Sequence, residues 1–124
     1  MKKDNQNQIL KIMKISDYKK LVKPKEHEIQ TEIMNYLRAK NWMVFRMNSG
    51  AIRTERGGLV RMNPAGTSDV LAIKNGKCTF IEVKRPGNKI TRLQEMKMEE
   101  LSSFGANCFV ATSVESVIAR LEKI

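Results

Sequence analysis

Apolar residues recur with helical spacing between positions 25 and 40. They lie three or four residues apart, which places them on one face of an amphipathic helix. The residues on this face are Ile29, Ile33, Met34, Tyr36 and Leu37. Asn41 can end the helix. The pattern therefore predicts that a helix opens the folded core.

Short apolar runs after this helix predict strands. The first run covers residues 42–47. Two further runs, at 70–74 and 78–83, lie on either side of the pair Asn75-Gly76, which tolerates the positive φ angles of tight turns. We expect these two runs to form an antiparallel hairpin.

The polar segment between the first strand and the hairpin, residues 48–67, is long for so small a domain. It predicts a long loop or a bent hairpin. Its basic residues outnumber its single acid, Glu55, and would suit contacts to a phosphate backbone. They are Arg53, Arg56 and Arg61.

The last third of the chain predicts a helix, a strand and a final helix. Thr91 is a good N-cap for a helix over 91–104, and Gly105 can stop it. A strand at 107–111 follows, and Ser113 opens a helix that reaches about Lys123. The order αβββαβα indicates an α/β fold in which helices cover a mixed central sheet.

The 124 residues suit one domain, residues 24–124, preceded by a basic N-terminal arm or helix at 1–23. Pro24 marks this boundary because the residue before a proline avoids helical geometry. The chain carries 23 Lys and Arg against 13 Asp and Glu, a net charge of +10 that favours a polyanionic partner such as nucleic acid. Eight of the lysines fall within residues 1–25, and the arm is either a solubilising tail or a DNA-binding element.

No apolar run approaches the roughly 20 residues that cross a bilayer, and the lysine-rich start lacks the apolar run of a secretory signal. We therefore expect a cytoplasmic protein with no membrane partner. Cys78 and Cys108 have neither disulfide-framework nor zinc-site spacing and are expected to be reduced core residues. The aromatic residues are also expected in the core rather than stacked on bases: Trp42, Phe45, Phe80 and Phe109.

The predicted hairpin brings two acidic residues together. If Lys74 pairs with Lys77, regular pairing places Asp69 opposite Glu82, with β-carbons about 5 Å apart. Two carboxylates at this distance repel unless a charge neutralises them, and Mg²⁺ or Mn²⁺ would do so with oxygen ligands.

Lys84 joins this pair through strand alternation. Residues two apart on a strand face the same side, so Glu82 and Lys84 share a face while Val83 points into the core. An ammonium group here can position a water molecule or stabilise charge in a transition state. In the alternative interpretation, Asp69 is a turn residue and Glu82 and Lys84 form a solvated ion pair.

The opening helix offers one more acid to the same site. At about 100° per residue, Glu26 and Gln30 lie beside the apolar stripe, whereas Glu28 and Glu32 lie about 200° and 240° away from Glu26. We expect Glu26 and Gln30 to face inward. A plain helix-starting role for Glu26 remains the alternative. His27 is expected to be exposed.

Together, five motifs resemble the VRR-NUC family of the PD-(D/E)XK nuclease superfamily over residues 24–112. They are Glu26-x-x-Ile29-Gln30, Asn48-Ser49-Gly50, Gly66-x-x-Asp69, Glu82-Val83-Lys84 and Thr91-x-x-Gln94. The resemblance implies a restriction-endonuclease-like core. Ser68 stands where the superfamily has proline, a substitution common in this family.

The resemblance also implies roles for individual residues. The metal would be bound by Asp69, Glu82 and the backbone carbonyl of Val83, with help from Glu26. Lys84 would be catalytic, with Gln30 beside it in the site. DNA contacts are expected from Asn48, Ser49, Arg53, Arg56, Arg61 and Gln94.

These features predict a Mg²⁺- or Mn²⁺-dependent DNA endonuclease that hydrolyses phosphodiester bonds. Stand-alone members of the family resemble Holliday junction resolvases, so we expect a homodimer that prefers branched or four-way junction DNA. A twofold dimer would match the symmetry of such a junction. The alternatives are a non-catalytic DNA-binding module with a nuclease fold and an RNA-processing nuclease.

Overall fold

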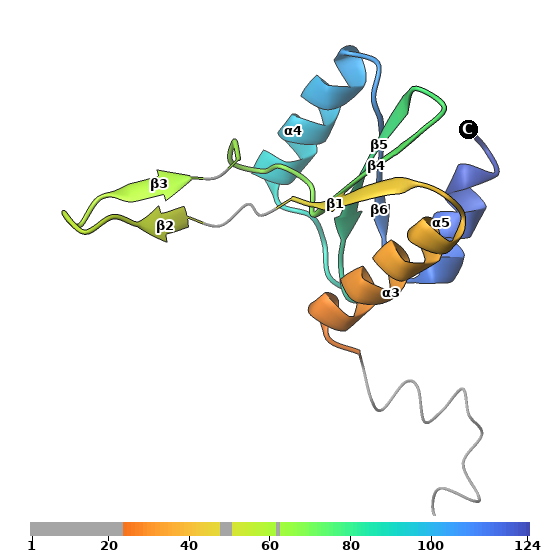
Figure 1. Ribbon diagram of the computed structural model, residues 1–124, viewed down its shortest axis with the longest axis horizontal. Coiled ribbons are helices and arrows are strands. Elements are labelled where there is room, and N and C mark those ends of the chain that lie inside the picture. Colours follow the sequence, from red (N-terminus) through yellow and green to blue (C-terminus); the bar gives the residue numbers. More distant parts are fainter. Residues whose placement is uncertain (1–23, 48–50, 62) are drawn as a thin grey trace, which may run out of the picture.

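The computed structural model of the chain describes residues 24–47, 51–61 and 63–124 (Figure 1). At its centre is a four-stranded sheet with the strand order β1-β4-β5-β6. The strands are β1 (Met43–Arg46), β4 (Val70–Lys74), β5 (Lys77–Val83) and β6 (Asn107–Ala111). β1, β4 and β5 pair antiparallel, and β6 pairs parallel to β5. The prediction of a mixed sheet is confirmed.

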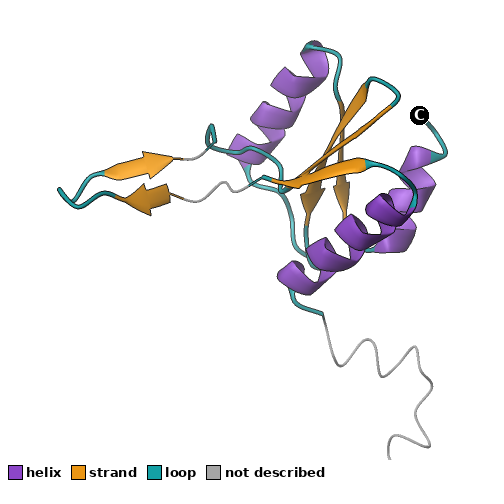
Figure 2. Cartoon of the chain, viewed as in Figure 1, coloured by secondary structure: helices purple, strands orange, loops and turns teal. Residues whose placement is uncertain are grey.

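The helices lie on both faces of this sheet (Figure 2). On one face α3 (Glu26–Ala39) and α5 (Val114–Leu121) pack against each other and against the sheet. On the other face α4 (Arg92–Ser103) lies against β6. The buried core fills the space between the sheet and the α3–α5 layer: Ile29, Ile33, Met34, Leu37, Val44, Val70, Ala72, Ile81, Val83, Phe109, Ala111 and Val117.

The predicted order of elements is confirmed, with one addition. The segment between β1 and β4 contains a second, two-stranded sheet made of β2 (Ala51–Arg53) and β3 (Leu59–Arg61). This antiparallel ribbon projects away from the core (Figure 1). Of the two predicted alternatives, the hairpin is therefore correct. Its turn is closed by the side chain of Thr54, whose Oγ1 accepts a hydrogen bond from the Gly58 amide at 3.0 Å.

Residues with positive φ end the elements where the sequence predicted. Asn41 has φ of 67° directly after α3, and Gly105 has φ of 96° after α4. Asn75 and Gly76 have φ of 52° and 76° and form the tight turn between β4 and β5. At the start of α4 the Gln94 amide donates a hydrogen bond to the Thr91 hydroxyl at 3.1 Å, as expected of an N-cap.

Two predictions about the core were wrong. Cys78 is exposed and Phe45 is 45% exposed, although both lie on strands of the central sheet. Their positions alternate with core positions, so both side chains face away from the α3–α5 layer. Both cysteines are free thiols, as predicted, and Phe109 is buried.

The predicted N-terminal arm lies outside the described residues. Within the described ranges, none of the helices has the length and apolar character needed to span a bilayer.

Gly66 fixes the loop before β4 against the start of α4. Its φ is +82°, and a β-carbon at this position would lie 2.6 Å from the backbone oxygen of Leu93. Gly57 has the same φ, but a β-carbon there would meet nothing within 4 Å. An alanine at Gly57 would therefore add backbone strain alone, whereas an alanine at Gly66 would add the same strain and a steric clash with Leu93.

We predict that Gly66→Ala lowers the free energy of unfolding by about 2 kcal/mol more than Gly57→Ala, because it adds overpacking against fixed backbone to the φ strain that both share. Urea denaturation of the two variants measures this difference. Equal losses would show that the loop does not need close contact with α4.

Candidate active site

Asp69 lies immediately before β4 and is held there by hydrogen bonds on both sides. Its carboxylate Oδ2 accepts a hydrogen bond from the Val83 amide at 2.9 Å, and its backbone oxygen accepts one from the Met47 amide at 2.7 Å. The register from Lys74↔Lys77 to Val70↔Ile81 makes Asp69 and Glu82 the next pair along the hairpin. The predicted pairing of the two acids is therefore correct in register.

Glu82 is buried at the end of β5, with only 1% of its surface exposed. Its Oε1 accepts a hydrogen bond from the Gln94 side-chain amide at 2.8 Å and lies 3.8 Å from the Lys84 Nζ. Its Oε2 is buried and has no hydrogen-bond partner among the described residues. A carboxylate with one bare oxygen is poorly solvated, and a proton or a cation would stabilise it.

The surroundings of Glu82 favour its neutral form. The pKa of Glu82 is raised from its ordinary value of 4.5 to about 8, mainly by burial and next by the negative charge of Asp69. Lys84 acts in the opposite direction, and Glu26 adds a smaller upward contribution to the pKa. A raised carboxyl pKa at a cluster of like charges is typical of functional sites.

Lys84 follows the last residue of β5 and shares the face of Glu82. Its amide donates a hydrogen bond to the Ala111 oxygen at 3.0 Å, which extends the β5–β6 pairing by one residue. The Lys84 side chain is 13% exposed. The alternative of a solvated ion pair is wrong, because one partner is buried and the other is nearly so.

Gln94 links Glu82 to the start of α4. Its Oε1 accepts a hydrogen bond from the Thr91 amide at 2.9 Å, which completes a capping box, while its Nε2 donates to Glu82. One amide side chain thus both starts the helix and orients the buried acid. The sequence placed Gln94 in the site but did not reveal this double contact.

Glu26 approaches the site from the first turn of α3. It is half-buried, and its charge is close enough to raise the pKa of Glu82, whereas Glu28, Glu32 and His27 are exposed. The predicted helical phase is therefore confirmed. Gln30 is half-buried one turn later.

Comparison with solved structures finds a similar fold. A chain described as "VRR_NUC domain" superposes with a TM-score of 0.59 over 78% of this chain and 94% of that chain, at 24% sequence identity. The chain has the VRR_NUC fold. No family model matches the sequence, and no curated protein does either. The fold that the motif resemblance implied is therefore confirmed by the structural comparison.

The VRR_NUC fold makes this a nuclease-fold domain, in which Glu82 is buried and Asp69 is half-buried. Among the described residues, no group of three or more His, Cys, Asp and Glu side chains could hold a metal ion. The available donors are two carboxyl groups, of which one has a bare oxygen. Two carboxylates with water completing the shell suit Mg²⁺, so these donors fit a hard divalent cation. Glu26 does not extend them to a cluster of three, and its role at the metal stays a prediction.

The remaining predicted DNA contacts are only partly within the described residues. Asn48 and Ser49 lie outside the described residues, as does the side chain of Arg61. Arg53 and Arg56 are exposed on the ribbon. The structure does not bring them next to the paired acids, and their DNA contacts stay predictions.

One basic residue beside Lys84 was not predicted. Arg85 directly follows Lys84 and is half-buried, and its Nε is buried without a hydrogen-bond partner among the described residues. In the sequence, only the position of Arg85 next to Lys84 indicated that it would lie near the site.

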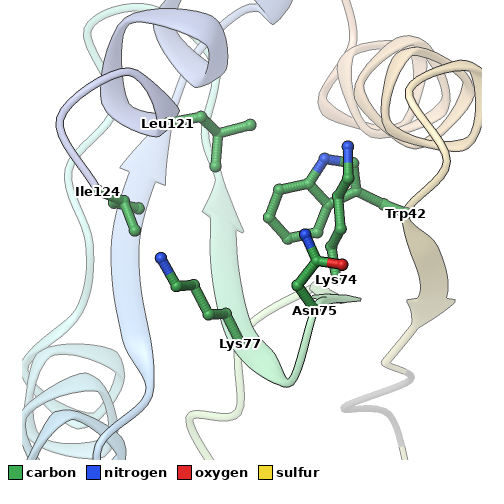
Figure 3. Close-up of a pocket in the computed structure, with 6 residues that line it drawn as sticks. All are labelled: Trp42, Lys74, Asn75, Lys77, Leu121 and Ile124. Atoms are coloured by element: carbon green, nitrogen blue, oxygen red, sulfur yellow. The ribbon is translucent and has the colours of Figure 1, made fainter.

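A separate hollow of about 170 Å³ lies at the opposite end of the β4–β5 hairpin (Figure 3). The Lys74 Nζ lies 5.8 Å from the centre of the Trp42 ring and donates a hydrogen bond to the Lys40 oxygen at 2.8 Å. These contacts tie the hairpin tip to the end of α3. The hollow is not part of the acidic site.

We predict that the free energy of unfolding of the metal-free protein falls as the pH rises from 4.5 to about 8, because folding raises the pKa of Glu82 over this range. In this window the unfolded chain releases the Glu82 proton while the folded chain keeps it, so rising pH favours unfolding. Glu82→Gln removes this contribution. The stability of the variant relative to the native chain should therefore rise by a few kcal/mol across the window and then level off. Urea denaturation in EDTA measures it, and a difference that does not change with pH would contradict the raised pKa.

Proposed function

We propose that this protein is a Mg²⁺- or Mn²⁺-dependent endonuclease that hydrolyses phosphodiester bonds in DNA. The observation that carries the proposal is the bare, buried Oε2 of Glu82, which lies on a nuclease fold beside a second carboxyl group and a nearly buried lysine. A purely structural ion pair would not need an acid whose pKa is raised to about 8. At a cation-binding site the buried acid is stabilised when the cation replaces the proton.

Asp69 and Glu82 would hold the cation, with the Val83 carbonyl as a further oxygen donor. The cation would supply Lewis-acid stabilisation of phosphate charge and lower the pKa of a bound water molecule. Asp69 is already oriented by the Val83 amide, and Glu82 by Gln94. The protein therefore supplies a rigid pair of donors and does not need to order them when the cation binds.

Lys84 would act on the reacting groups themselves. Its ammonium lies 3.8 Å from the Glu82 carboxyl group, and the Lys84 side chain is 13% exposed, which supports a position beside the proposed cation in a poorly hydrated environment. In such surroundings a positive charge can orient a water molecule and stabilise the extra charge of the phosphoryl transition state. Glu26 would accept a proton from water or orient it from the α3 side.

DNA is the substrate that the charge distribution favours. The chain has a net charge of +10, and the projecting ribbon presents Arg53 and Arg56 to solvent. A two-stranded ribbon of this kind can follow a DNA groove, and arginine pairs well with phosphate. The half-buried Arg85, which directly follows Lys84, would add a further positive charge close to the phosphate.

We further propose that the active form is a homodimer that prefers four-way junctions or other branched DNA. A single domain of this size has little surface for recognising DNA shape. Two copies related by a twofold axis would match the symmetry of a junction.

We predict that Asp69→Asn and Glu82→Gln abolish cleavage, because each removes a charged ligand, and that Lys84→Ala lowers the rate by roughly a hundredfold or more. Glu26→Gln should also impair cleavage, while Glu32→Gln on the exposed face of the same helix should not. Single-turnover cleavage of labelled DNA with Mg²⁺ measures these effects. Near-normal turnover by Asp69→Asn or Glu82→Gln would overturn the assignment, and equal losses from Glu26→Gln and Glu32→Gln would exclude a specific role for Glu26.

Substrate preference is tested with matched linear, flap and four-way DNA and with RNA, each with Mg²⁺, Mn²⁺ or EDTA. We expect cleavage that needs the cation, favours the four-way junction and spares RNA, together with a dimer mass by light scattering. A monomer that cuts junction and duplex equally would contradict the dimer and junction proposal but not the nuclease. Binding without cleavage under all conditions would favour the DNA-binding module, and preferential RNA cleavage would favour the RNA-processing alternative.

A further inference from the structure

The central sheet has a second apolar face, on the side away from α3 and α5. The strand registers align its residues in two rows across β1, β4 and β5: Met43, Ile73 and Cys78 in one, and Phe45, Leu71 and Phe80 in the other. These positions alternate with core residues such as Val44 and Ala72, so their side chains point to the opposite side. We call these six residues the open face.

Among the described residues, no helix covers most of the open face. Met43 is 62% exposed, and Phe45 and Cys78 are also exposed, while the other three residues of the face are half-buried. α4 lies against β6 at the neighbouring edge of the sheet. Between that helix and the open face is a hollow of about 400 Å³, lined in part by Phe80, Leu101 and the 85% exposed Phe104.

A contiguous apolar surface of this kind is unusual on a soluble domain and usually marks a binding surface. Sheets with apolar residues on both faces are normally covered on both faces. The open face therefore calls for an occupant that the described residues do not supply.

The size of the open face favours a short peptide segment over a second copy of the chain. A stable interface between proteins uses about 20 to 30 residues on each side. The open face has six, bordered by Leu101 and Phe104, which is enough for one segment of about two helical turns or one strand.

The chain contains such a segment before the described core. Residues 9–15 read Ile-Leu-Lys-Ile-Met-Lys-Ile, in which five of the seven residues are apolar. The ten residues from 16 to 25 can span about 33 Å when extended, about twice the length of the five-residue strand β4. This length of chain is available to carry the segment around the sheet edge from α3, which lies on the opposite face. A covalent tether raises the local concentration of the segment to about the millimolar range.

We propose that residues 9–15 pack on the open face of the same chain and form the missing cover of the sheet. The apolar side chains of the segment would lie against the two rows, and its lysines would remain in solvent. The open face continues into the row of Asp69 and Glu82, because Cys78, Phe80 and Glu82 lie on the same side of β5. The segment would therefore border the acidic site, but it supplies no group to the cleavage chemistry. This packing also gives the N-terminal arm a structural function in place of a solubilising one.

The test uses the full-length chain with Cys108→Ser, which leaves Cys78 as the single thiol on the open face. The rate at which Cys78 reacts with an aromatic disulfide reagent reports whether the face is covered. We expect slow reaction at every protein concentration, and an acceleration of roughly tenfold or more in the double variant Ile12→Asp and Met13→Asp. Lys11→Asp with Lys14→Asp introduces the same two acids at lysine positions and is the matched control, which should react slowly.

Each alternative gives a different result. Fast reaction of Cys78 in the parent protein would show that nothing covers the open face. Slow reaction that is unchanged in the Ile12→Asp and Met13→Asp variant would exclude the segment as the cover. Protection that increases with protein concentration would assign the face to a second copy of the chain. Circular dichroism of each variant verifies that the core remains folded, and exchange protection of the β4 and β5 amides provides a readout that does not depend on Cys78.

Discussion

The burial of the Glu82 carboxyl group is the constraint around which this domain is arranged. A carboxylate in an apolar sheet is unfavourable unless hydrogen bonds or an opposite charge compensate it. Here Gln94 supplies one hydrogen bond, Lys84 supplies charge at 3.8 Å, and within the part of the chain that the structure describes one oxygen is left without a partner. The burial of the Glu82 carboxyl group is therefore only partly compensated, and the surrounding fold holds the group in this unfavourable environment.

Several elements meet at this carboxyl group. The tight β4–β5 turn sets the register that brings Asp69 beside it, and the parallel β5–β6 pairing continues to Lys84. The capping box of α4 uses the same Gln94 that orients Glu82, so the start of the helix and the geometry of the site are coupled. Gly66 allows the loop before Asp69 to approach the first turn of that helix. Local backbone geometry and the site therefore depend on each other.

The sequence predicted those parts of the structure that depend on local pattern. The Asn75-Gly76 turn fixed the pairing of the two acids, and helical phase separated Glu26 from Glu28 and Glu32. Contacts between distant elements could not be predicted in this way, such as the hydrogen bond from Gln94 to Glu82. The exposure of Phe45 and Cys78 was missed because an apolar run does not reveal which sheet face a helix will cover. The same uncertainty conceals the open face from a sequence reading.

In the proposed function, the proton on Glu82 and a divalent cation compete for one site. Titration of Mn²⁺ into the full-length protein at pH 7, followed by calorimetry in buffers of different ionisation enthalpy, measures the protons released on binding. With a Glu82 pKa of about 8, binding should release close to one proton from the native protein, and Glu82→Gln should abolish both binding and release. Binding without proton release, or equal binding by the variant, would contradict the claim.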